Sequence, residues 1–239
     1  AENENNTGHV RVYQYFSGNW SQLGSDIDGE AADDYSGHSV SMSSDGTILA
    51  IGAQGNDENG NDAGHVRVYQ YSSGSWSQLG SDIDGEAADD MSGRSVSLSS
   101  DGTIVAIGAA ENGNNTGHVR VYQYSSGSWS QLGSDIDGEA ADDMSGRSVS
   151  MSSDGTILAI GAIRNNGNGN NAGHVRVYQY SSGSWSKLGS DIDGEAANDM
   201  SGRSVSLSSD GTIVAIGAAE NGNNTGHVRV YQYSSGSWS

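Results

Sequence analysis

The sequence contains no cysteine and no proline, and it has a single phenylalanine, Phe16. The absence of cysteine excludes a disulfide framework and any thiolate metal site. No run of 18 apolar residues occurs and no charged-then-apolar leader opens the chain, so the sequence predicts neither a membrane span nor a retained signal peptide. It also has no amphipathic pattern of helical length, which leaves strands as the expected secondary structure.

Basic residues are scarce. The 239 residues include 10 Lys and Arg against 30 Asp and Glu, which gives a formal net charge of -20. A polyanion is repelled by a field of this sign. Nucleic acid is therefore not an expected partner.

A long motif, Gly-His-Val-Arg-Val-Tyr-Gln-Tyr, recurs along the whole chain. Its copies are separated by 56, 53, 56 and 53 residues and begin at Gly8, Gly64, Gly117, Gly173 and Gly226. The length difference lies in one Asn/Gly-rich segment, which is long at 54–63 and 163–172 and short at 110–116. Such variation in length is typical of an exposed loop between repeated structural units.

Each unit contains four short apolar or alternating stretches separated by turn-forming residues, in one unit 95–99, 103–109, 118–124 and 128–136. These predict four antiparallel strands. The stretch Thr-Ile-(Leu/Val)-Ala-Ile-Gly-Ala is apolar at successive positions, as in a strand buried on both faces between neighbouring sheets. The predicted fold is all-β: a β-propeller type with tandem four-stranded antiparallel blades, about four blades plus a surplus half-blade. The expected single repeat domain, 1–239, divides into a half-blade at 1–34 and blades at about 35–90, 91–143, 144–199 and 200–239.

The order of motifs suggests a family. The segment Ser-Gly-Arg-Ser-Val-Ser-(Met/Leu)-Ser-Ser-Asp-Gly-Thr-Ile-(Leu/Val)-Ala-Ile-Gly-Ala, followed by a loop and Gly-His-Val-Arg-Val-Tyr, resembles the FG-GAP repeat of integrin α-subunit propellers and their microbial relatives. The resemblance implies a propeller fold. Ser replaces the Phe of Phe-Gly, the Pro of Gly-Ala-Pro is absent, and the calcium loop of the family is reduced here to Ser-Ser-Asp-Gly, so that metal site is not carried over.

A different acidic turn, Asp-x-Asp-Gly-Glu, offers hard oxygen ligands that suit calcium. Asp and Gly are also the residues that turns need, so a solvated acidic turn is the alternative. The candidate calcium ligands are Asp26, Asp28 and Glu30, Asp82, Asp84 and Glu86, Asp135, Asp137 and Glu139, and Asp191, Asp193 and Glu195. No other cofactor is predicted.

The sequence shows no catalytic constellation. His9, His65, His118, His174 and His227 open one strand in each unit, and His38 stands where the other units have Arg94, Arg147 and Arg203. None of these histidines has a second His at ligand spacing, which favours packing or hydrogen bonding at strand edges. A nucleophile elbow, Gly-x-Ser-x-Gly, is missing. We therefore expect no enzymatic activity.

Four Asn residues fit the N-glycosylation pattern: Asn5, Asn19, Asn114 and Asn223. Three of them fall in the same predicted loop. Chance matches in a chain rich in Asn and Ser are the alternative.

The surplus half-blade repeats the strands that end the chain, because residues 1–21 nearly duplicate residues 219–239. An unpaired strand edge is adhesive. The leading functional prediction is a non-enzymatic structural or adhesive protein, extracellular or on the cell surface, that self-associates head-to-tail into a filament or larger ring. The alternatives are a lectin-like propeller that binds a glycan or cell-surface ligand at one shallow site per blade, and a designed or recently amplified consensus propeller.

Overall fold

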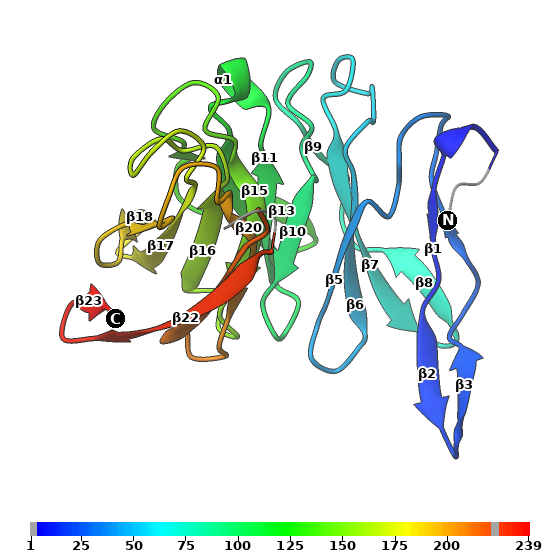
Figure 1. Cartoon of the computed structure of the whole chain (residues 1–239). Coiled ribbons are helices and arrows are strands. Elements are labelled where there is room, and N and C mark those ends of the chain that lie inside the picture. The colour runs from blue at the N-terminus through cyan, green and yellow to red at the C-terminus, as the bar shows by residue number, and fades with distance from the viewer. Residues whose placement is uncertain (1–3, 221–224) are drawn as a thin grey trace.

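The repeats fold into separate antiparallel sheets that stand side by side along an arc (Figure 1). This arrangement is seen in a computed structural model, which describes residues 4–220 and 225–239. The all-β, blade-type fold predicted from the repeats is confirmed. Apart from a 3-10 turn at Glu4–Asn6 and α1 (Asn112–Asn115) in the short loop, the described elements are strands.

Blades 1 and 2 each contain a path of four strands in sequence order, from the inner strand to the outer strand, plus a fifth short strand. Blade 1 contains β5 (Ser39–Met42), β6 (Ile48–Ala53), β7 (His65–Ser72), β8 (Ser75–Gln78) and β9 (Ile83–Asp84). Blade 2 contains β10 (Ser95–Leu98), β11 (Ile104–Ala109), β12 (His118–Ser125), β13 (Ser128–Gln131) and β14 (Ile136–Asp137).

Blades 3 and 4 repeat this order, with longer inner strands. Blade 3 contains β15 (Ser145–Met151), β16 (Ile157–Ala162), β17 (His174–Ser181), β18 (Ser184–Lys187) and β19 (Ile192–Asp193). Blade 4 contains β20 (Ser201–Leu207), β21 (Ile213–Ala218), β22 (His227–Ser234) and β23 (Ser237–Trp238). The half-blade contains β1 (His9–Val10), β2 (Tyr13–Phe16), β3 (Asn19–Gln22) and β4 (Ile27–Asp28).

The fourth predicted strand is in fact two strands in the half-blade and in blades 1, 2 and 3. In blade 2 the segment expected at 128–136 is interrupted by Gly133, whose φ of +81° turns the chain. After this turn β14 pairs with the beginning of β12, where Asp137 lies opposite His118. The acidic turn is thereby held beside the histidine that opens the long strand.

Apolar side chains fill the seams between neighbouring sheets. At the second seam, between blades 1 and 2, Val66 and Val68 pack against Val96, Leu98 and Ile107 of the next blade. Equivalent clusters fill the third seam, between blades 2 and 3, and the fourth, between blades 3 and 4. Burial on both faces explains why the second strand of these blades, β6, β11 and β16, is apolar at successive positions.

Serine side chains connect the inner strands across these seams. The hydroxyl of Ser95 donates to the carbonyl of Gly146 at 2.8 Å, and the hydroxyl of Ser97 accepts from the amide of Met151 at 3.0 Å. The same pair of bonds recurs between blades 1 and 2 and between blades 3 and 4. The alternating Ser residues of the inner strands therefore fix the register of one blade on the next.

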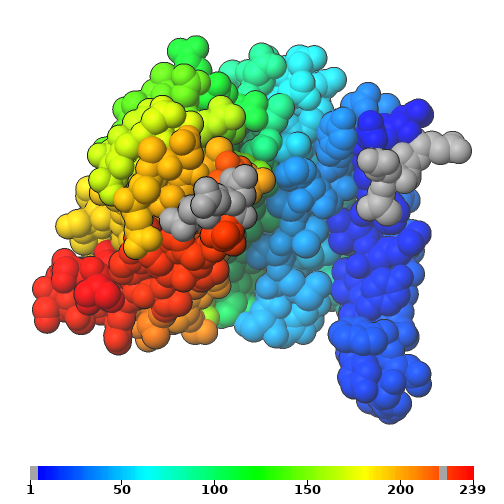
Figure 2. Space-filling model, in the orientation of Figure 1, coloured from blue at the N-terminus to red at the C-terminus, as the bar shows by residue number. Residues whose placement is uncertain are grey.

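The two ends of the arc lie apart, and the half-blade does not pair with the strands of blade 4 (Figures 1 and 2). Val228 and Val230 on the free face of blade 4 are 68% and 64% exposed, whereas Val66 and Val68 at the same positions of blade 1 are 0% and 1% exposed. The described chain is thus an open arc of blades.

Candidate functional site

The acidic turns do not gather their own carboxylates around one point. In the turn of blade 1, Asp82 lies beside His65 of the same blade, whereas Glu86 lies beside His118 of blade 2. The predicted set of Asp82, Asp84 and Glu86 is therefore split between two seams, and the sets at Asp135 and Glu139 are divided in the same way. Each resulting group combines an acidic residue of one blade with a histidine and an aspartate of the next.

Three such groups occur among the described residues, with ligand-type atoms that lie within 4.8 Å of one another. We call them clusters 1, 2 and 3. They comprise Glu30, Glu58, His65 and Asp82 at the first seam, between the half-blade and blade 1; Glu86, His118 and Asp135 at the second seam; and Glu139, His174 and Asp191 at the third seam.

An arginine two residues after each histidine reaches across the same seam. Arg67 Nη1 lies 2.9 Å from Glu30 Oε1, and Arg120 Nη1 lies 3.4 Å from Glu86 Oε1. Arg120 also donates to the carbonyl of Asp84 at 2.8 Å. These contacts hold the turn of one blade on the long strand of the next.

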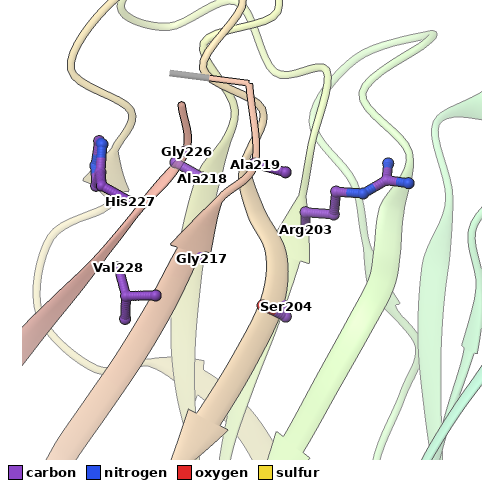
Figure 3. Close-up of a pocket in the computed structure, with 8 residues that line it drawn as sticks. All are labelled: Arg203, Ser204, Gly217, Ala218, Ala219, Gly226, His227 and Val228. Atoms are coloured by element: carbon purple, nitrogen blue, oxygen red, sulfur yellow. The ribbon is translucent and has the colours of Figure 1, made fainter. Parts of the chain in front are cut away.

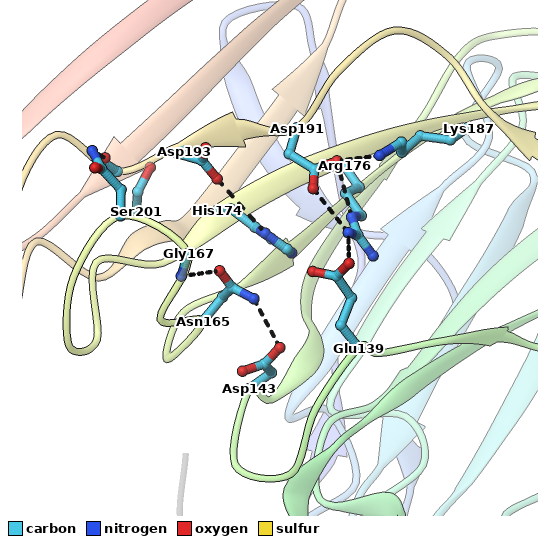
Figure 4. A network of polar contacts seen from close by, with 12 residues as sticks. Glu139, Asp143, Asn165, Gly167, His174, Arg176, Lys187, Asp191, Asp193 and Ser201 are labelled. Carbon is cyan, nitrogen blue, oxygen red and sulfur yellow. Dashed lines mark hydrogen bonds and ion pairs between the residues drawn. The ribbon is translucent and has the colours of Figure 1, made fainter.

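Cluster 3 carries more positive charge than the other two. Arg176 forms ion pairs with both Glu139 and Asp191, and Lys187 donates to Asp191 at 2.7 Å (Figure 4). Burial alone raises the pKa of Asp191, but the hydrogen bonds and charges of Arg176 and Lys187 outweigh burial and lower the pKa to about 2. Two cations thus already neutralise the two carboxylates of cluster 3.

The histidines of the clusters are buried in the seams. Burial lowers the pKa of His65, His118 and His174, and the nearby arginine of each lowers it further. At neutral pH these rings are therefore held neutral, which is the form that can bind a metal ion.

A second group of charged side chains occupies the inner edge of the arc. Strands β5, β10, β15 and β20 lie next to one another in this order, and one basic side chain lies just before or near the start of each. These four side chains, which we call the inner cationic row, are His38, Arg94, Arg147 and Arg203. The row gathers three of the ten Lys and Arg residues of a chain with a net charge of -20.

The row has few anionic partners. Arg94 lies 3.5 Å from Glu111, and it donates to Gln54 at 3.2 Å. Within the described ranges, no carboxylate lies within 4.0 Å of Arg147 or Arg203. Burial lowers the pKa of Arg147, and the charges of Arg94 and Arg203 lower it further. The row is therefore a concentration of unbalanced positive charge that favours an anion.

The same neighbours act on His38. Burial lowers the pKa of His38, and the charges of Arg94 and Arg147 lower it further. A neutral imidazole beside guanidinium groups can accept a proton from water while the arginines bind a developing negative charge. The sequence analysis predicted a packing role for His38 and did not identify the row. The repeated basic residue next to the start of each inner strand could have indicated it.

A hollow of about 620 Å³ lies on the free face of blade 4, lined by Ser204, Gly217, His227 and Val228, with the backbone of Arg203 at its edge (Figure 3). The side chain of Arg203 points away from His227 and toward the neighbouring blade. In the other blades this space is filled by the next sheet. The hollow is therefore an uncovered seam, distinct from the inner cationic row.

The predicted glycosylation positions lie at the surface where they are described. Asn5, Asn19 and Asn114 are exposed. Asn223 lies outside the described residues. Glycosylation at these positions stays a prediction.

The FG-GAP repeat family model matches residues 26–69 and 135–178. Both matches run from an acidic turn through the inner strand to the long strand of the next blade, so the resemblance inferred from the motifs is confirmed. No curated protein sequence matches the chain.

Solved structures with the same fold are distant in sequence. A periplasmic gluconolactonase of Pseudomonas aeruginosa matches 95% of this chain with a TM-score of 0.64 at 16% identity, over 61% of its own length. A protein from Lactobacillus plantarum matches 98% with a TM-score of 0.62 at 19% identity, over 64% of its length. TolB from Acinetobacter baumannii matches 94% with a TM-score of 0.51 at 14% identity, over 49% of its length. The chain thus spans less than two thirds of each of these proteins.

These neighbours correct two functional predictions. The expectation of a non-enzymatic adhesive filament, with the lectin-like propeller as its alternative, is wrong, because a neighbour of this fold is a periplasmic enzyme. The expectation that the chain has no enzymatic activity is contradicted by the same finding, because the fold of the chain is one that an enzyme also has. The physical reason is that the repetition is not complete at the inner edge, where His38 stands in place of the arginine of the other blades, so near-identical repeats do not exclude a single catalytic site there. Among the described residues, no helix has the length and apolarity needed to cross a bilayer.

Proposed function

The chain carries FG-GAP repeats folded as propeller-type blades, and from this premise we propose that it is a non-cytoplasmic hydrolase of small sugar lactones. The inner cationic row is the proposed active site. The observation that carries the proposal is a row of neighbouring charges in a strongly acidic chain: Arg94 and Arg147 act on the neutral His38, and Arg203 acts on Arg147. The name of the periplasmic gluconolactonase supports the substrate class and the location.

The residues of the row suit the steps of lactone hydrolysis. His38 accepts a proton from water as the water oxygen attacks the ring carbonyl carbon. The arginines stabilise the negative charge that develops on the carbonyl oxygen. The bond between the carbonyl carbon and the ring oxygen then breaks, and the ring oxygen takes the proton from His38. The product is an open-chain hydroxy acid, whose carboxylate the same arginines can bind.

Separate variants test binding and chemistry. We expect the protein to hydrolyse glucono-1,5-lactone faster than the uncatalysed reaction and to bind gluconate in a calorimetric titration. Arg147→Gln should weaken gluconate binding by roughly 10- to 100-fold, since a hydrogen bond to a charged group contributes about 1.5–3 kcal/mol. His38→Gln should abolish the rate enhancement and leave a folded protein, because His38 lies before β5 and outside the pairing of β5 with β6.

A matched control removes an arginine elsewhere. Arg11 lies in the half-blade and pairs with Asp26 at 2.8 Å. Arg11→Gln changes the net charge by the same amount as Arg147→Gln, and it should leave both binding and rate unchanged. Equal effects of the two substitutions, or a rate no higher than the buffer rate with the unsubstituted protein, would contradict the proposal.

A further inference from the structure

Cluster 1 differs from the other two clusters because a fourth ligand-type side chain enters it. Glu58 comes from the long loop of blade 1 and joins Glu30, His65 and Asp82. The equivalent position in the long loop of blade 3 is Gly167, and the short loop of blade 2 lacks the position. We propose that cluster 1 is a binding site for one divalent cation of the zinc type, held across the first seam by His65 and carboxylates of the half-blade and blade 1.

A buried polar group without a partner points to a ligand in this cluster. The side chain of His65 is 1% exposed, and neither ring nitrogen has a hydrogen-bond partner. Its Nδ1 lies 3.7 Å from Asp82 Oδ2, too far for a hydrogen bond. A buried imidazole normally makes hydrogen bonds or binds a metal, so a cation between His65 and Asp82 satisfies both groups.

The charges also distinguish the clusters. Cluster 1 sets the carboxylates of Glu30, Glu58 and Asp82 against one guanidinium, that of Arg67, which leaves two negative charges unbalanced. Cluster 2 sets two carboxylates against Arg120, which leaves one. Cluster 3 sets two carboxylates against Arg176 and Lys187, which leaves none. A divalent cation neutralises cluster 1 and meets decreasing attraction in clusters 2 and 3.

The chemistry of the donor set favours zinc over calcium. Calcium takes six to eight oxygen ligands, whereas zinc takes about four ligands and accepts an imidazole nitrogen among carboxylates. Bonds of about 2.0–2.1 Å to a tetrahedral ion bring ligand atoms to roughly 3.4 Å from one another. The ligand atoms of cluster 1 lie within 4.8 Å, and the two glutamates are exposed, so their side chains can move inward to close the site.

The first experiment measures stoichiometry and affinity with zinc chloride alone. We expect the metal-free protein to bind one zinc ion per chain in a calorimetric titration, and excess calcium not to displace it. Glu58→Gln should weaken binding by roughly tenfold or more, because loss of even an indirect partner of a metal ligand has effects of that size. Glu58 is exposed, and within the described part of the chain its side chain forms no hydrogen bond or ion pair, so this variant is expected to fold.

Two controls make the site assignment specific. His118→Gln alters the equivalent histidine of cluster 2 and should leave the zinc affinity unchanged, whereas His65→Gln should abolish binding. The double substitution Gly167→Glu with Lys187→Gln gives cluster 3 a third carboxylate as its fourth ligand-type side chain and removes one cation, so it should add a second zinc ion per chain. X-ray absorption of the zinc-loaded protein should show one imidazole nitrogen among oxygen ligands.

Several results would overturn the proposal: no zinc bound, an unchanged affinity in Glu58→Gln, displacement by calcium, or a first shell of oxygen atoms without nitrogen. The site shares no residue with the inner cationic row. Zinc binding can therefore fail while lactone hydrolysis succeeds, and the reverse.

Discussion

Arg67 of blade 1 and Glu30 of the half-blade form an ion pair across the first seam, with 2.9 Å between Nη1 and Oε1. The same relation recurs at each later seam, for example between Arg120 and Glu86 at 3.4 Å. Arg11, the equivalent residue of the half-blade, has no preceding blade within the described chain and turns to Asp26 of its own sheet. The partner of a repeated side chain is thus set by the neighbouring blade rather than by the repeat itself.

The outer tryptophans give the first test of this dependence on a neighbour. Trp129 Nε1 donates to the carbonyl of Leu79 in the preceding blade at 2.7 Å. Trp129→Phe removes this bond and part of the packing, so we expect the free energy of unfolding to fall by about 1–2 kcal/mol. Trp20 in the half-blade is 69% exposed, and Trp20→Phe should leave the stability unchanged. Urea denaturation of both variants checks the difference, and equal losses would contradict the role of the seam.

Glycines at the middle of the second strand give another comparison. A Cβ added at Gly108 would overlap the carbonyl oxygen of Gly146 in the next blade. Gly217 in blade 4 meets no next blade, and a Cβ there meets only the hydroxyl of Ser204 closely. We expect Gly108→Ala to destabilise the protein by about 1–3 kcal/mol through overpacking, and Gly217→Ala to have a clearly smaller effect. Shifts of the denaturation midpoint at constant m value would report these changes.

The sequence predicted the blades well because their information is local. Turn residues such as Ser100-Asp101-Gly102 and the apolar stretch ending at Ala109 specify strands wherever they occur. The break at Gly133 was missed, although the segment Gly-Ser-Asp carries a turn signal. Strand positions therefore follow from the sequence, with errors where a short turn interrupts a longer polar stretch.

The sites were less predictable because they depend on which blade lies next to which. Asp82 and Glu86 are four residues apart, and the spacing suggested one ion between them. The turn instead lies over a seam, so the two side chains reach different histidines. The inner cationic row has the same cause: its members lie more than 50 residues apart and meet because inner strands of successive blades are adjacent.

Acid titration gives a third test, centred on cluster 3. The pKa of Asp191 is lowered from its ordinary value of 3.8 to about 2, so its contribution to stability is fully present above about pH 4 and is lost as the pH falls toward 2. With allowance for solvent screening, we expect about 1 kcal/mol. Asp191→Asn should lower stability by this amount at pH 5, and the difference from the unsubstituted protein should vanish near pH 2. A difference that persists at pH 2 would instead indicate packing.

The pH dependence of hydrolysis is the most direct test of the role of His38. Its pKa is lowered by burial and by Arg94 and Arg147, so the ring should be in its basic, proton-accepting form throughout the range above the ordinary value of 6.5. The enzymatic rate, after subtraction of the buffer rate, should be level near pH 7 and should fall with decreasing pH at a point below 6.5. Arg94→Gln removes one of the charges that lower the pKa, so it should move this fall to higher pH. The control Arg11→Gln should leave the profile in place. If the pH dependence of the rate is the same in Arg94→Gln as in the unsubstituted protein, the titrating group lies outside the inner cationic row. This result would contradict the role of His38 as the proton acceptor.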